Sequence, residues 1–214
     1  MEIDHTGTLR PQMTGVLVGA LALGLALVGL ELADAPLLDL VRDPSYVSDS
    51  PWWTGSISLI GLLLWAAAAG MLLLTGVVLR DGGEPRRARF FLASAALVGW
   101  LGVDDAVLVH EEILPDEVGV PRRVVLVLYG AVAAAWALRF RRELARDGAL
   151  MAIVAGGFAA SVLLDNADTL PGIPAGYGVA VAEDYTKYVA LSALLAWALL
   201  VTRRELVEVR RTAP

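Results

Sequence analysis

Long apolar stretches separated by short polar segments constrain this fold more than any other feature of the sequence. A membrane-spanning helix needs about 20 mostly apolar residues. Six stretches approach that length, and we expect spans over residues 14–30, 54–79, 90–114, 124–138, 149–164 and 186–201. Because backbone polar groups inside a bilayer must be satisfied within the protein, the sequence predicts an all-α, polytopic membrane helix bundle. We expect six transmembrane helices in one transmembrane domain, residues 1–214.

The composition agrees with a membrane protein. Hydrophobic residues make up 57% of the chain and charged residues only 19%, whereas soluble domains are about one quarter charged. We therefore expect the lipid bilayer as a partner and no nucleic acid, while an oligomer is compatible with the sequence. The chain has no Cys, which excludes disulfides and thiolate metal sites.

The distribution of basic residues predicts the orientation in the membrane. Arg10, the segments 80–89 and 139–147 and the C-terminal tail hold 13 of the 17 basic residues. By the positive-inside rule we expect a multi-pass protein of the cell membrane with both termini in the cytoplasm. The acidic connections then face outward.

The first span has an alternative interpretation. Ala33-Asp34-Ala35 resembles a signal-peptidase cleavage site, so the apolar stretch before it could be a cleaved signal peptide. The acidic residues Glu2 and Asp4 and the length of the stretch favour a retained helix.

A short repeated pattern suggests tandem two-helix hairpins. Ala-Trp-Ala-Leu at 135–138 is followed by Arg-Arg-Glu-Leu at 141–144, and both motifs recur at 196–199 and 203–206. Trp136 and Trp197 are 61 residues apart, as are Asp104 and Asp165. A duplicated hairpin would produce this pattern, although chance matches are common in Ala- and Leu-rich sequences. Small residues at Ala152, Gly156 and Ala160 indicate a helix contact.

The segment 100–117 carries the chemistry that most needs an explanation. Asp104 lies 14 residues beyond Phe90, about 21 Å along a helix, so it falls below the outer surface of a membrane core of about 30 Å. Asp105, Glu111 and Glu112 share one helical stripe with Asp104, whereas His110 falls off it. We therefore expect His110 to lie away from Asp104 and to contribute only through a neighbouring helix.

Three further residues complete the candidate site. Asp165 ends the fifth span, and Glu183 and Lys187 open the sixth at a spacing that allows an ion pair. The sequence predicts a cation or proton site formed by Asp104, Asp105, Asp165 and Glu183, with His110 and Glu111 as secondary candidates and Lys187 as an ion-pair partner. Clustered carboxylates suit hard divalent cations such as Ca²⁺, Mg²⁺ or Mn²⁺, so a divalent cation is the candidate cofactor. Alternatively, Asp104 and Asp105 are structural, bonded to Trp100 or Ser161 or paired with Lys187. The more exposed acids would then form a solvated rim, made of Glu111, Glu112, Asp116, Asp168 and Asp184.

Three functions remain open. A small carrier would bind a cation or proton at buried carboxylates and release it by alternating access, and this is our first expectation. A metal-dependent hydrolase would act on a lipid substrate, and a non-catalytic scaffold would use the acids only to hold helices together. Phosphate-binding loops, HExxH and GxSxG motifs are absent from the sequence.

Overall fold

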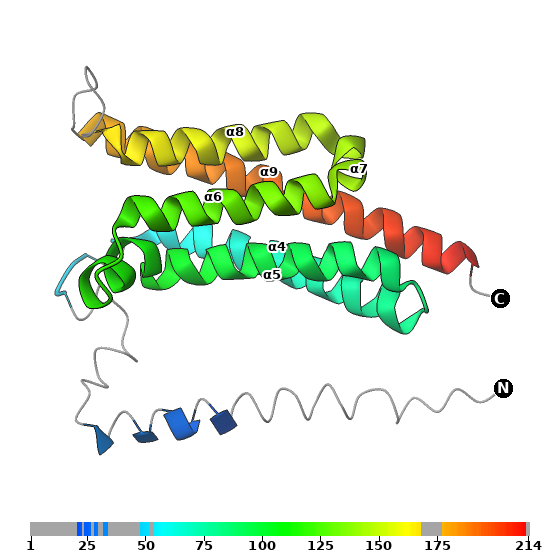
Figure 1. Ribbon diagram of the computed structural model, residues 1–214, viewed down its shortest axis with the longest axis horizontal. Coiled ribbons are helices and arrows are strands. Elements are labelled where there is room, and N and C mark those ends of the chain that lie inside the picture. Colours follow the sequence, from blue (N-terminus) through cyan, green and yellow to red (C-terminus); the bar gives the residue numbers. More distant parts are fainter. Residues whose placement is uncertain are drawn as a thin grey trace. The chain divides into compact units, whose positions relative to one another are not determined.

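The computed structural model describes residues 54–167 and 177–212, together with residues 48–51 and positions 21, 22, 24–26, 28, 29, 32 and 33. Two compact units divide the chain, residues 1–56 and 57–214. Helices α5 to α9, and all of α4 beyond its first residue, belong to the second unit (Figure 1). The expected first span, residues 14–30, lies largely outside the described residues, although those described between 21 and 29 are helical. Two of the three residues of the cleavage-site alternative, positions 34 and 35, also fall outside them.

The first hairpin of the second unit consists of α4, Ser56–Asp81, and α5, Pro85–Val107. Pro85 begins α5 at the position where a missing N–H costs nothing, and Gly83 has φ +81° in the connecting turn. Helix α5 ends at Val107, seven residues before the expected end at 114. Leu108 adopts a left-handed conformation with φ 55°, and a π-helical segment, η1, follows over Val109–Glu117.

Four further helices and a short turn follow along the described part of the chain. Helix α6 spans Arg122–Arg139, and a short connection follows, made of α7, Arg141–Leu144, and the 3₁₀ turn η2, Ala145–Asp147. Helix α8, Gly148–Asp165, then packs along α9, Tyr177–Thr212. Helix α9 has 36 residues, and it begins nine residues before the expected sixth span and continues through the basic tail.

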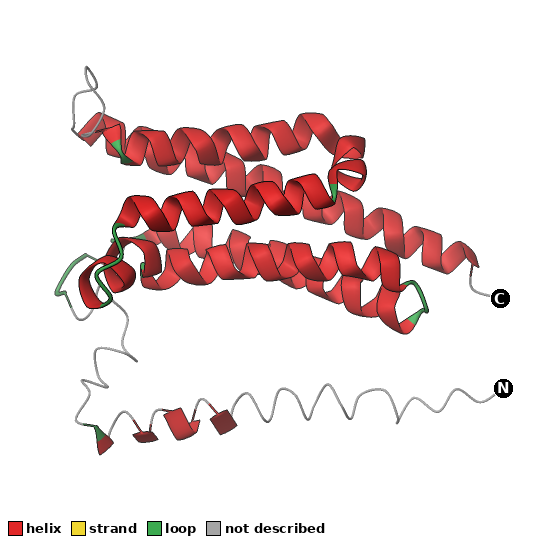
Figure 2. Cartoon of the chain, in the orientation of Figure 1, coloured by secondary structure: helices red, strands yellow, loops and turns green. Residues whose placement is uncertain are grey.

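The all-α prediction is confirmed for the described residues, which contain helices and connections but no strands (Figure 2). Four helical segments are long and apolar enough to cross a membrane: Ser56–Asp81, Pro85–Val107, Arg141–Asp165 and Gly178–Glu208. Their surfaces carry large apolar side chains such as Leu63, which is 68% exposed. Because this many exposed apolar side chains would be unfavourable in water, the surface is suited to contact with lipid.

Aromatic side chains fill the centre of the bundle. Phe90 of α5 packs against Trp136, Phe140 and Trp197, and the two Trp rings meet edge to face with centroids 6.5 Å apart. Trp136 Nε1–H donates to Ser94 Oγ at 3.2 Å, which satisfies its polar group inside the apolar core. This packing ties α5, α6 and α9 together between the two ends of the bundle.

The expected contact through Ala152 and Gly156 is wrong, because both residues face away from the neighbouring helices. A Cβ added to Gly156 would have no atom within 4 Å, whereas one added to Gly157 would lie 2.8 Å from Ala190 Cβ. The α8–α9 contact therefore uses the adjacent face. In a helix that is apolar all round, spacing alone does not reveal which face is buried.

Candidate functional site

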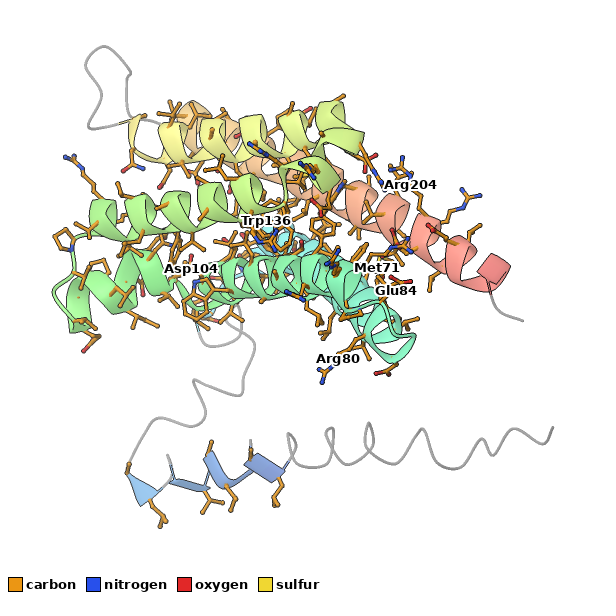
Figure 3. The ribbon with its side chains drawn as sticks, turned by 45° about the vertical axis from the view of Figure 1, so that its right-hand side comes forward. Met71, Arg80, Glu84, Asp104, Trp136 and Arg204 are labelled. Carbon is orange, nitrogen blue, oxygen red and sulfur yellow. The ribbon has the colours of Figure 1, made fainter. Side chains whose placement is uncertain are left out.

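Asp104 is the centre of a hydrogen-bonded cluster near the C-terminal end of α5. Arg80 and Glu84 lie toward the other end of the bundle (Figure 3). The Asp104 side chain is 5% exposed, and His110 Nδ1–H donates to Asp104 Oδ2 at a distance of 2.5 Å. Oδ1 accepts two more hydrogen bonds of 2.9 Å, one from the backbone N–H of His110 and one from the hydroxyl of Tyr129 on α6. The buried Asp104 carboxylate therefore has three hydrogen-bond partners within the protein.

The break at Leu108 explains how His110 reaches Asp104. In a continuous α-helix, residues six apart point to different sides, which is why the sequence places His110 away from Asp104. That expectation is wrong. The left-handed Leu108 ends α5 and interrupts its helical periodicity, and its backbone N–H donates to the carbonyl of Asp104. The π-helical segment η1 then turns the His110 side chain back toward Asp104.

A graded path connects this cluster to the protein surface. The side chain of Glu111 is 39% exposed, that of His110 is 15% exposed and that of Asp104 is 5% exposed. His110 Nε2 lies 3.4 Å from Glu111 Oε1, while Nδ1 faces Asp104. The imidazole therefore stands between an exposed carboxylate and a buried one.

Arg122, the first residue of α6, joins Glu111 to the end of α8. Its Nη2 lies 3.3 Å from Glu111 Oε1 and forms an ion pair with Asp165. Its Nε is buried and has no hydrogen-bond partner. Asp165 is thus paired with a guanidinium, and among the described residues Arg122 and Glu111 link it to the Asp104 cluster.

Asp105 belongs to a different set of contacts. Lys187 of α9 donates to Asp105 Oδ1, and Trp65 Nε1–H of α4 donates to Oδ2 at 3.2 Å. Of the partners that the sequence allows for Lys187, the structure shows Asp105 and not Glu183. A cavity of about 20 Å³ adjoins this pair, which is room for about one water molecule.

The predicted site residues therefore divide into separate groups. Asp104, His110 and Glu111 come together, Asp165 is bound to Arg122, and Asp105 is bound to Lys187. Glu183 lies on α9, and among the described residues its carboxylate is not an ion-pair partner of any base. In the part of the chain that the structure describes, no three His, Asp or Glu side chains are placed to hold a metal ion together.

Comparison with known proteins finds a matching family. The family described as Domain of unknown function (DUF8692) matches residues 15–203. The chain belongs to this family. No curated protein and no solved structure matches it significantly.

The sequence did not reveal three residues of the site, Tyr129, Arg122 and Trp65. Tyr129 lies in the middle of an apolar helix, and a single phenol there gave no positional signal. Arg122 stands at the start of an expected span, where an Arg ordinarily snorkels to the headgroups, and Trp65 lies within an apolar run that does not distinguish its ring from the neighbouring side chains. Each of the three contacts an acid on another helix. The order of residues along the chain does not specify which helices face each other.

Proposed function

We propose that the protein is a proton-coupled membrane carrier, and that Asp104 and His110 form the group that takes up and releases the proton. The observation that carries this proposal is the 2.5 Å contact between His110 Nδ1 and the buried Asp104 carboxylate, with Nε2 directed at the exposed Glu111. A His paired with a carboxylate is the common protein group for exchanging protons near neutral pH.

The arrangement in the membrane is part of the same proposal. Helix α6 carries three Arg, at positions 122, 123 and 139, and these stand at its two ends, where their side chains can reach the headgroup region. With α6 and the N-terminal stretch as additional spans, the bundle has six spans, both termini lie in the cytoplasm, and Glu111 opens outward in the cell membrane. The meeting of Trp136 and Trp197 fits two related hairpins packed together.

The contacts favour a proton over a metal cation at Asp104, Asp105 and Asp165. Asp105 and Asp165 each have a cationic side-chain partner, and Asp104 accepts three hydrogen bonds. A bound cation would have to displace these partners, whereas a proton can move between His110 and its neighbours without displacing any of them. Glu183 remains the candidate ligand for a coupled cation on α9.

The proton site can be observed directly because the chain has only two His. A His5→Gln variant leaves His110 as the single source of histidine signals in ¹⁵N NMR of the protein in nanodiscs. We expect both ring nitrogens of His110 to change between neutral and charged shifts across a pH series in which circular dichroism stays constant. Asp104→Asn should alter this titration, and the exposed Asp116→Asn should leave it unchanged.

Transport is tested in liposomes that contain the full chain and a pH-sensitive dye. We expect one of Na⁺, K⁺, Mg²⁺ or Ca²⁺, added outside, to change the internal pH, and Asp104→Asn or His110→Gln to abolish this change. A His110 ring that stays in one protonation state throughout the pH series would contradict the proton site. Proton movement no faster than in protein-free liposomes with every cation would leave the acids as links between helices.

A further inference from the structure

A basic cavity lies at the end of the bundle opposite Asp104. Its volume is about 690 Å³, and five Arg side chains from three elements line it. These are Arg86 and Arg89 of α5, Arg139 at the end of α6, and Arg141 and Arg142 of α7. The start of α5 and the α6–α7 junction lie at the same end of the bundle (Figure 1). We call this set the five-Arg cavity.

The five-Arg cavity lacks the acidic partners that neighbouring arginines have. Among the described residues, none of these five Arg is within 4.0 Å of a carboxylate oxygen, and Glu143 is the only acid in the cavity lining. A second cavity of about 460 Å³ adjoins it, and there Arg87 pairs with Glu205 and Glu208 while Arg204 pairs with Asp147 at 2.6 Å. The paired arginines hold helices together, whereas the five arginines of the cavity are exposed, and the Arg139 guanidinium lies over the Phe140 ring at 5.1 Å from its centroid.

We propose that the five-Arg cavity binds a phosphate-bearing anion, and that in the membrane this anion is the headgroup of an anionic lipid. Guanidinium groups match phosphate oxygens through paired hydrogen bonds, and basic pockets between membrane helices recognise lipid headgroups. Leu138, which is 70% exposed, lines the same cavity and offers an apolar contact for an acyl chain. Arg86 and Arg89 stand in the first turns of a candidate span, at the level of a headgroup.

Ordinary anchoring does not account for this arrangement. Arginines that anchor a span point separately into the headgroup region. Here arginines from both sides of the α6–α7 junction and from α5 converge on one cavity, where their mutual repulsion is unfavourable without an anion. The proposal concerns the basic end of the bundle and does not depend on proton coupling at Asp104.

Native mass spectrometry of the full chain in detergent tests the proposal with three probes: phosphatidylglycerol, phosphatidylcholine and inorganic phosphate. We expect phosphatidylglycerol to bind about tenfold more tightly than phosphatidylcholine. The double variant Arg89→Gln/Arg139→Gln should lose about tenfold in affinity for phosphatidylglycerol, because two charge-assisted contacts are removed. Arg89→Lys/Arg139→Lys should retain part of the preference, which shows that the lost binding is not a folding defect.

The matched control is Arg80→Gln/Arg203→Gln, which removes the same charge from two exposed arginines outside the cavity. We expect this control to bind phosphatidylglycerol as the unmodified protein does. Displacement of the lipid by inorganic phosphate would support the same site with a soluble source of the anion. Equal losses in the two Gln variants, or no preference for phosphatidylglycerol, would overturn the proposal.

Discussion

Adjacent aspartates with different partners are the main feature at the scale of single residues. Asp104 and Asp105 are neighbours in α5, and successive residues of an α-helix point about 100° apart. Asp104 therefore faces Tyr129 of α6, while Asp105 faces Trp65 of α4 and Lys187 of α9. One acid lies on a path to the surface, and the other links three helices.

Asp105 and Lys187 should stabilise the bundle as a unit. Asp105→Asn or Lys187→Met alone should lower the free energy of unfolding by about 1–3 kcal/mol, because each change leaves the other partner partly buried without its counter-charge. The double variant should lose less than the sum of the single variants, with a coupling energy of about 1 kcal/mol or more. Unfolding in detergent, followed by circular dichroism, measures all three values.

Asp116→Asn provides the control for this cycle, since Asp116 is exposed and the substitution is chemically the same. It should change the unfolding free energy by less than about 0.5 kcal/mol. Additive losses in the double variant would show that Asp105 and Lys187 act independently.

At the scale of helices, close contacts depend on individual glycines. A Cβ on Gly157 of α8 would lie 2.8 Å from Ala190 Cβ and 3.1 Å from the Thr186 carbonyl oxygen, both in α9. Helix backbones in a membrane protein approach this closely where a small residue leaves room, and dispersion contacts then hold them together. The site residues Asp165 and Lys187 are on these two helices, so this contact also positions the site.

Gly157→Ala should therefore destabilise the protein. We expect a loss of about 1–3 kcal/mol in unfolding free energy, because the added methyl group forces α8 and α9 apart. Gly156→Ala is the matched control, since nothing lies within 4 Å of its Cβ, and it should be neutral or stabilise the helix by up to about 1 kcal/mol. Unfolding in detergent measures both, and equal effects of the two changes would refute the contact.

At the scale of the whole molecule, the two ends of the bundle carry different charges and different contacts. The Arg87 and Arg204 ion pairs join α5, α9 and η2 at one end. The Asp104, Asp105 and Asp165 contacts join helices at the other end. Two polar clusters separated by an aromatic core define an axis along which a membrane protein can be oriented.

The orientation along this axis can be measured with single cysteines, because the chain contains none. Glu84→Cys should react with a membrane-impermeant maleimide only after the cells are opened, since the positive-inside rule places the basic turn in the cytoplasm. Glu117→Cys, at the opposite end, should react in intact cells. Labelling of position 84 from outside would reverse the proposed topology.

The sequence by itself determined the class of this protein, because hydropathy and charge act over whole segments. Apolar runs at α4, α5, α8 and α9 are long enough to span a membrane wherever they pack, so the all-α fold and its membrane-length helices followed from composition. The importance of the segment 100–117 followed in the same way, because Asp104 interrupts an apolar run at a depth where a charge needs a partner.

Only the tertiary structure decided which partner each charged residue has. The left-handed conformation of Leu108 brings His110 to Asp104. The sequence gives no sign of this conformation, because Leu rarely adopts it. Tyr129, Arg122 and Lys187 reach their acids from other helices. Hydropathy specifies that a segment is helical and immersed in lipid, but the rotation of each helix depends on close packing between helices, and that rotation determines which side chains meet.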